Sequence, residues 1–167
     1  MAEPQLPVIR AATLADLEDI RRMQCALADH EMPFDSNIDE RLKMGKSGYV
    51  GYVNIEEYIK KQGEDYYVVV AEAEQTCVGI CYGQIKKDDD WSILEKFGYV
   101  GCVFVEERYR GGGLKVWARM LEELTVWFKE RDIKQLRLEC YVNNPAAVRA
   151  YEKLDFKPMQ YIMHKSI

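Results

Sequence analysis

The sequence lacks the features of a membrane, secreted or zinc-binding protein. No apolar run in its 167 residues approaches the ~20 residues that a bilayer-spanning helix needs. Residues 1–20 contain neither the basic nor the apolar segment of a signal peptide, so none is expected. The only histidines, His30 and His164, lie far apart, and we expect no metal site. The five cysteines show no CxxC spacing, which favours reduced thiols in a cytoplasmic protein over disulfides.

Charge is in modest negative excess and is unevenly distributed. The net charge is −5, and residues 1–66 account for it, because they hold 13 acidic and 8 basic residues, whereas residues 67–167 hold 15 of each. Two interpretations are open: the acidic residues are solvated helix faces, or they form a wall that attracts a cationic partner. Nucleic-acid-binding proteins are more often basic, so we expect neither a nucleic-acid nor a membrane partner.

Hydrophobic periodicity predicts one α/β domain over residues 1–167, built around a mixed sheet. Strands are expected at 7–13, as a pair within 65–87 joined by a turn near 74–76, at 97–107 and at 133–143, with one or two more in 157–167. Helices are expected from a cap at Thr13 to about residue 27, at 55–62 after Asn54, over roughly 18 residues after Gly113, and at 144–156. Residues 88–96 are predicted to form a loop.

Three consecutive glycines, Gly111, Gly112 and Gly113, stand directly before a predicted helix. Each costs roughly 0.5–1 kcal/mol relative to alanine in a regular element, so the backbone there must bend sharply or lie against a ligand. The N–H groups of a first helical turn lack intrahelical acceptors and carry partial positive charge, which suits a phosphate beside Arg110. A tight strand-to-helix turn is the alternative. Neither the Walker A nor the GxGxxG motif is present.

A second motif follows "YRGGGLK" some thirty residues later, in the segment "LRLECYVNNPAAVRAYEKLDF". With both motifs, the sequence resembles the GCN5-related N-acetyltransferase (GNAT) family, whose phosphate loop reads Arg/Gln-x-x-Gly-x-Gly/Ala. Arg110 and Gly113 match this loop, and Lys115 stands where the family has a small residue. The later signature reads Asn-x-x-Ala-x-x-x-Tyr-x-x-x-Gly-Phe. Four residues match it, with Asp155 in place of the glycine: Asn144, Ala147, Tyr151 and Phe156.

The resemblance implies a mixed, mostly antiparallel sheet of six or seven strands flanked by about four helices, and acetyl-CoA as co-substrate without a metal. Main-chain groups near Val103 and Val105 would pair with the pantetheine arm, and Asn144 would bond to that arm. Lys115 would either stay in solvent or contact a phosphate. The residues implied to cradle the pyrophosphate are Arg110, Gly111, Gly112, Gly113, Leu114 and Lys115.

The resemblance also implies two catalytic residues. An alkylamine has a pKa near ~10.4, so acetyl transfer needs a group that removes its proton. Glu139 is the preferred base, because "LEC…N" looks like a strand of bacterial ribosomal-protein N-terminal acetyltransferases; a surface ion pair with Arg137 or a lysine is the alternative. Tyr151 would protonate the departing thiolate, or else pack its ring in the core. The reserve candidates are Glu106, Glu107, Tyr141 and the loop acids Asp88, Asp89 and Asp90.

The function implied is acetyl-CoA-dependent N-acetyl transfer to a primary amine by direct attack in a ternary complex. The acidic first third favours a small cationic metabolite or drug-like amine. The alternatives are a peptide or protein acceptor, at an N-terminus or a lysine, and a non-catalytic acyl-CoA-binding regulatory module. Family members are often dimers, so a homodimer is a further expectation.

Overall fold

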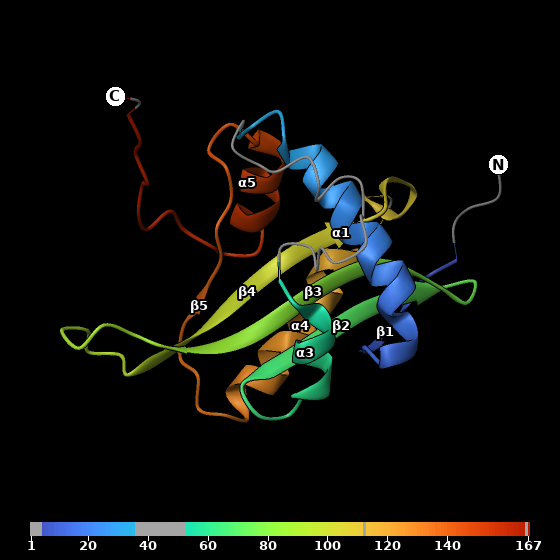
Figure 1. Ribbon diagram of the computed structural model, residues 1–167, viewed down its shortest axis with the longest axis horizontal. Coiled ribbons are helices and arrows are strands. Elements are labelled where there is room, and N and C mark those ends of the chain that lie inside the picture. The colour runs from blue at the N-terminus through green and yellow to red at the C-terminus, as the bar shows by residue number, and fades with distance from the viewer. Residues whose placement is uncertain (1–4, 36–52, 112, 166) are drawn as a thin grey trace.

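A mixed β-sheet with helices on both faces organises the chain (Figure 1). The computed structural model describes residues 5–35, 53–111, 113–165 and 167. Within these residues the strand order is β1-β2-β3-β4-β5, with β4 and β5 parallel and all other neighbours antiparallel. The strands are β1 (Val8–Ala11), β2 (Tyr66–Ala73), β3 (Thr76–Lys87), β4 (Lys96–Val105) and β5 (Leu136–Arg137). The α-helices are α1 (Leu17–Glu31), α3 (Ile55–Lys60), α4 (Val116–Lys129) and α5 (Pro145–Glu152), and the short 3₁₀ helices are η1 (Leu14–Asp16) and η2 (Glu107–Tyr109).

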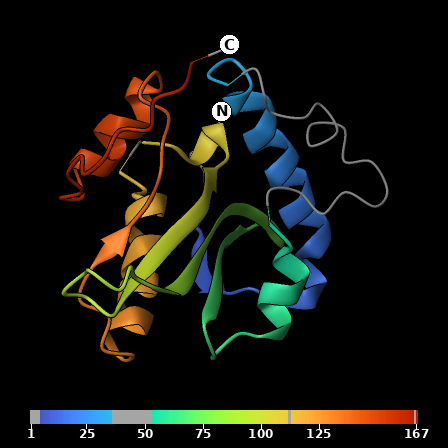
Figure 2. The same ribbon diagram turned by 60° about the vertical axis from the view of Figure 1, so that its left-hand side comes forward.

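The sheet is covered on both faces because its central strands are apolar at successive positions. In β2, Val68 and Val70 pack in the cluster that includes α1 and α3, whereas Val69 and Ala71 pack in the cluster that includes α4. All four side chains are fully buried. Figure 2 shows α4 on one side of the strands and α1 and α3 on the other. The predicted α/β architecture with a mostly antiparallel sheet is confirmed.

Two helices begin at the predicted caps. The Thr13 N–H donates to Asp16 Oδ2 at 2.7 Å in a capping box, and Asp16 also accepts two hydrogen bonds of 2.8 Å from the Arg10 guanidinium. Asn54 caps α3 by accepting from the Glu57 N–H at 3.2 Å. Local side-chain-to-backbone bonds therefore fix where these helices start.

Strand β4 contains a bulge that separates its two halves. Cys102 has a φ of +51°, in the left-handed region, and the register with β3 shifts next to Tyr82. Position 101 requires glycine, because a Cβ there would lie 2.5 Å from the Tyr82 ring. Pairing with β5 is limited to Gly98 and Tyr99. Beyond Tyr99, the outer edge of β4 therefore has no strand partner in the described part of the chain.

The strand expected over 133–143 is wrong beyond Arg137. Leu136 packs against the core, but Val142 is 68% exposed. The physical reason is that β4 bends at its bulge and offers no further pairing partner, so the segment leaves the sheet. The segment after Arg137 is instead held by the residues that follow α1, because the Tyr141 hydroxyl donates to Asp35 Oδ2 at 3.2 Å.

The strands expected in 157–167 are also absent from the residues that can be described there, so the sheet has five strands rather than six or seven. The short β5 gives this tail too little edge to pair with, and Figure 1 shows it running away from the sheet. None of the described helices is long and apolar enough to cross a bilayer. The tail exposes large apolar side chains, namely Met159, Tyr161, Ile162, Met163 and Ile167.

An ion pair joins the β3–β4 connection to β5. Arg137 donates to both carboxylate oxygens of Asp88, at 2.6 and 3.0 Å, and its guanidinium lies 4.0 Å from the centre of the Phe97 ring. The Asp88 side chain is only 7% exposed, and the pKa of its carboxyl is lowered to about 2, chiefly by the Arg137 hydrogen bonds. Asp88, one of the reserve candidates for the base, is therefore held in a structural ion pair.

Replacing Asp88 with Asn should destabilise the fold at neutral pH but not in strong acid. Because the folded pKa lies below the ordinary value of about 3.9, the pair stabilises the protein above about pH 4, and the stabilisation is lost as the pH falls towards about 2. Urea midpoints of wild type and Asp88→Asn should differ at pH 7 and converge towards pH 2. Asp90→Asn is the control, since its pair with Lys87 is almost fully exposed. A difference that persists at pH 2 would contradict the assignment.

Candidate active site

Four segments converge where β4 ends: the C-terminal half of α1, the end of β4 with η2, the start of α4, and the segment from residue 138 into α5. Figure 2 shows η2 between α1 and α5. Aromatic contacts join these segments. The Phe34 and Tyr141 rings stack at 6.2 Å, and the Trp117 and Tyr151 rings meet edge to face at 6.0 Å. The motif residues found in the sequence are thus brought together from distant parts of the chain.

The glycine-rich loop leaves the start of α4 without a side-chain cap. Gly111 and Gly113 have φ values of +75° and +82°, and a Cβ on either would meet no atom within 4 Å, so backbone conformation rather than crowding requires glycine. Lys115 occupies the cap position at φ +49°, and its side chain makes no capping hydrogen bond. The first turn of α4 also has no acidic residue. Its N–H groups and the helix dipole therefore suit an anion. Gly112 lies outside the described residues.

Two loop side chains have definite placements beside this turn. Leu114 is partly buried and packs against the core, and its N–H donates to the Gly111 carbonyl at 3.1 Å. Lys115 is exposed, and its ammonium has no partner among the described residues. The two interpretations of Lys115, solvated or in contact with a phosphate, remain predictions.

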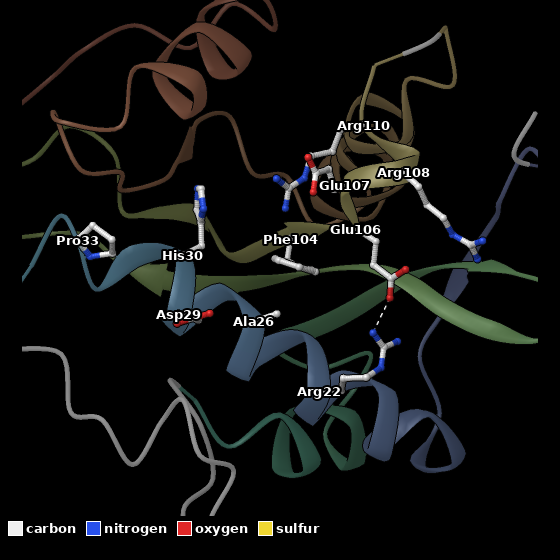
Figure 3. Close-up of a pocket in the computed structure, with 10 residues that line it drawn as sticks. All are labelled: Arg22, Ala26, Asp29, His30, Pro33, Phe104, Glu106, Glu107, Arg108 and Arg110. Atoms are coloured by element: carbon white, nitrogen blue, oxygen red, sulfur yellow. Dashed lines mark hydrogen bonds and ion pairs between the residues drawn. The ribbon is translucent and has the colours of Figure 1, made fainter. Parts of the chain in front are cut away.

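Arg110 ties the start of the loop to the end of β4. Its Nε donates to the Val105 carbonyl at 2.6 Å, and the guanidinium lies 5.4 Å from the centre of the Phe104 ring. Figure 3 shows this side chain turned towards a cleft between α1 and the end of β4. Val105 is buried and Val103 partly buried, both on the stretch of β4 that has lost its β5 partner.

The cleft has a volume of about 710 Å³ and carries charges of both signs. Arg22 closes one part of it by donating to Glu106 at 2.5 Å (Figure 3). Glu106, a reserve candidate for the base, is therefore already paired. The cleft is lined by Arg22, Ala26, Asp29, His30, Pro33, Phe104, Glu106, Glu107, Arg108 and Arg110.

Tyr151 lies in the last turn of α5 with its ring fixed and its hydroxyl available. The ring contacts Trp117 edge-on at 6.0 Å and Phe156 at 6.1 Å. The hydroxyl makes no hydrogen bond to any residue that the structure describes, so the alternative of a bond to a core carbonyl gains no support. Burial, followed by the nearby Cys140 and Glu31, raises the pKa of Tyr151 above its usual value. A phenol is protonated at neutral pH in any case, so the hydroxyl carries a proton that it can donate.

Asn144 has a structural task that the motif did not reveal. Its side chain is buried and caps α5, with Oδ1 accepting from the Ala147 N–H at 3.2 Å. Pro145 follows at the first helical position, where its missing N–H leaves no hydrogen bond unmade. The cap uses the amide oxygen, so any bond from Asn144 to a cofactor arm would have to come from its nitrogen.

Glu139 is exposed and does not pair with Arg137, because Arg137 is held by Asp88. Its side chain instead lies by the Tyr99 hydroxyl. Burial first, and then the charge of Glu139 and a hydrogen bond with it, raise the pKa of Tyr99 to about 12. Tyr99 precedes the β4 bulge and was not found by motif comparison. Tyr99 lies on the same strand as Val103 and Val105, and this shared strand is the sequence feature from which it could have been identified.

The donor set does not resemble a metal centre. Among the described residues, no group of three or more His, Cys, Asp or Glu side chains could hold a metal ion. The chemistry that the site offers is anion binding at the α4 N-terminus, proton donation at Tyr151 and proton acceptance at Glu139.

Solved structures share this fold over nearly the whole chain. The tetramutant of the BH1408 protein from Bacillus halodurans matches with a TM-score of 0.73 and 21% identity, covering 96% of this chain and 99% of that one. A predicted acetyltransferase from Clostridium acetobutylicum, crystallised with acetyl-CoA, matches with a TM-score of 0.70, 16% identity, and 96% coverage of both chains. The aminoglycoside N-acetyltransferase AAC(6')-Iy, in complex with CoA, matches with a TM-score of 0.68 and 14% identity, covering 96% and 94%.

Sequence comparison gives the family directly. No curated protein matches the chain significantly, but residues 27–156 match the sequence profile of the acetyltransferase (GNAT) family. The fold shared with the solved structures is therefore that of an acetyltransferase, and this chain belongs to the GNAT family.

Proposed function

We propose that the protein is an acetyl-CoA-dependent N-acetyltransferase that acetylates a small cationic primary amine by direct attack in a ternary complex. The observation that carries this proposal is the pairing of an uncapped helix N-terminus with a protonated phenol. Trp117, in the first turn of α4, contacts the ring of Tyr151, so the helix N-terminus and the proton donor belong to one site.

The residues present fit acetyl-CoA. A diphosphate suits the first turn of α4, which has neither a cap nor an acidic residue. The unpaired edge of β4 near Val103 and Val105 offers main-chain groups that need partners, and the Asn144 nitrogen lies at the start of the facing helix. The indole N–H of Trp117 is buried and finds no acceptor among the residues that the structure describes, as expected of a group that meets a ligand. When bound, the co-substrate supplies an activated thioester.

The protons are moved by two residues of this chain. Glu139 accepts a proton from the amine, because an alkylammonium with a pKa near ~10.4 has no lone pair for attack at neutral pH. Tyr151 donates its proton to the departing sulfur, because a phenol is fully protonated at neutral pH and the raised pKa of Tyr151 keeps it so. The nitrogen loses two protons in all: the first goes to Glu139 before attack, and the second, released as the C–S bond breaks, replaces the proton that Tyr151 gives to the sulfur.

A cationic small molecule is favoured over a peptide by the surroundings of the site. Three carboxylates, those of Glu31, Asp35 and Glu139, lie on the segments that surround the site. The end of α1 reaches across to residue 141 through the Asp35–Tyr141 hydrogen bond and the Phe34–Tyr141 stack, which narrows the approach. Similarity to an aminoglycoside N-acetyltransferase supports an amine of this kind.

Two measurements on the purified protein test the proposal. Calorimetry should detect binding of CoA and acetyl-CoA, and free-thiol release should accelerate with small cationic amines more than with a peptide of neutral side chains. Reactions without amine give the background hydrolysis. Binding without acceleration by any amine would favour the non-catalytic acyl-CoA-binding module, whereas faster release with the peptide would favour a protein acceptor. Absence of any binding heat would sink the assignment.

We also propose that the enzyme is a cytoplasmic homodimer. All five cysteines are free, which fits a reducing compartment. The tail leaves five large apolar side chains exposed, and a second copy of the chain would cover such a surface. Light scattering that gives the mass of a monomer at micromolar concentration would exclude the dimer.

A further inference from the structure

The ammonium group of Lys86 rests on the face of the Tyr99 ring. Its Nζ lies 3.6 Å from the ring centre, a cation–π contact that joins the end of β3 to β4. The strand register explains the contact, because Lys86 pairs with Phe97 and Tyr99 is its diagonal neighbour on the same face. The Tyr99 ring is itself held by the buried Tyr82, whose ring centre lies 6.3 Å away. The ammonium group therefore has a defined place.

Glu139 reaches the same face of the sheet. Tyr99 packs against the cluster that includes α1 and α3, whereas Leu138 packs against the cluster that includes α4. Successive side chains of an extended segment point to opposite faces, so Glu139 turns away from α4 and towards Tyr99. The pairing of Tyr99 with Arg137 places Glu139 only two residues further along, and Glu139 hydrogen-bonds the Tyr99 hydroxyl. One ring thus carries an ammonium group on its face and the proposed base at its hydroxyl.

Lys86 differs in its surroundings from the lysine that follows it. Lys86 is partly buried, and its ammonium group has no carboxylate partner in the part of the chain that the structure describes. The Lys87 side chain is 81% exposed, and its Nζ pairs with Asp90 at 3.2 Å. The fold therefore directs the amine of Lys86 towards the proposed base and leaves the amine of Lys87 in solvent.

The proposed acid lies on the other side of the sheet. Tyr151 contacts Trp117, which packs against the cluster that includes α4. Beyond Tyr99, the outer edge of β4 has no strand partner among the described residues. A thioester whose sulfur meets Tyr151 can therefore present its carbonyl carbon across this edge to an amine at Glu139. Lys86 supplies a primary amine on that side without any second molecule.

We propose that Lys86 is a self-acetylation site, to which the enzyme transfers the acetyl group of acetyl-CoA when no acceptor amine is bound. This inference rests on the proposed acetyl transfer. Glu139 takes one proton from the ammonium group, Nζ bonds to the acetyl carbon, and the C–S bond breaks. Tyr151 gives its proton to the sulfur and regains one from the nitrogen, so the products are an acetylated Lys86 and the CoA thiol. The acetylated side chain has lost the charge that held it on the Tyr99 ring.

The test incubates the purified protein with acetyl-CoA in the absence of amine and follows each lysine by peptide mass spectrometry. We expect one acetyl group per chain, at Lys86, with Lys87 modified at least about tenfold more slowly. Lys87 is the matched control, because uncatalysed acetylation favours the more exposed of two neighbouring lysines. Glu139→Gln should slow acetylation of Lys86 about 10²-fold and leave that of Lys87 unaltered. Equal modification of the two lysines, or a rate at Lys86 that ignores Glu139→Gln, would overturn the proposal.

A second variant and the amine reaction separate this inference from the proposed function. Lys86→Arg keeps a cation for the Tyr99 ring but offers no nucleophile, because a guanidinium stays charged. Its thermal unfolding should match that of the wild type, and the initial release of one thiol per chain without amine should vanish. Turnover of added amines with an unmodified Lys86 would overturn self-acetylation alone. Acetylation of Lys86 without turnover of any amine would support self-acetylation and overturn the small-amine acceptor.

Discussion

Replacing Tyr151 with Phe is expected to lower kcat about 10²–10⁴-fold while leaving the acetyl-CoA Kd almost unchanged. The ring would keep its edge-on contacts with Trp117 and Phe156, so the local packing should survive. What disappears is a hydroxyl that bonds no described residue and whose raised pKa keeps its proton in place at neutral pH. Turnover, measured by free-thiol release, should therefore fall, while acetyl-CoA affinity, measured by calorimetry, should stay the same.

The control for this substitution is Tyr161→Phe. Tyr161 is 73% exposed on the C-terminal tail, and removing its hydroxyl should alter neither quantity. A Tyr151→Phe enzyme with unchanged kcat would show that the tyrosine is only a packing residue. Loss of acetyl-CoA affinity with unchanged kcat would instead make it a binding group.

The sequence predicted those parts of the site that depend on local interactions. The caps at Thr13 and Asn54 are bonds between a side chain and the backbone three residues away, so short patterns contain them. Asp155 takes a φ of +65° where the family has glycine, as a residue with a short polar side chain can at a helix end. Such features place Tyr151 on α5 without knowledge of the rest of the fold.

Features set by distant contacts were missed. Alternation over 133–143 predicted a long strand, but strand length depends on a partner, and the bulge at Cys102 bends β4 away after Tyr99. Arg22 bonds Glu106 only because the fold packs α1 against the end of β4, a contact between residues 84 positions apart. Arg137 was paired with Glu139 in the surface alternative, whereas the fold gives it Asp88. No short sequence pattern contains the information that fixes these long-range contacts.

Replacing Glu139 with Gln is expected to lower kcat/KM about 10²–10³-fold at pH 7 and to change the shape of its pH profile. Without the base, only amine that is already neutral can attack. For a pKa near ~10.4, that fraction rises about tenfold with each pH unit. The variant should therefore regain activity steadily between pH 7 and pH 9.5, while the wild type, which deprotonates bound ammonium, should change far less. The raised pKa of Tyr151 keeps its proton in place over this range, so the acid is not lost meanwhile.

Glu152→Gln is the matched control for Glu139→Gln, because Glu152 is exposed on α5 and the substitution removes the same charge. Its profile should follow that of the wild type. Initial rates with saturating acetyl-CoA, measured at half-unit steps of pH, are sufficient for the comparison. If Glu139→Gln and wild type gave parallel profiles, the carboxylate would serve only to attract the amine, and the proton would leave through another group or directly to water.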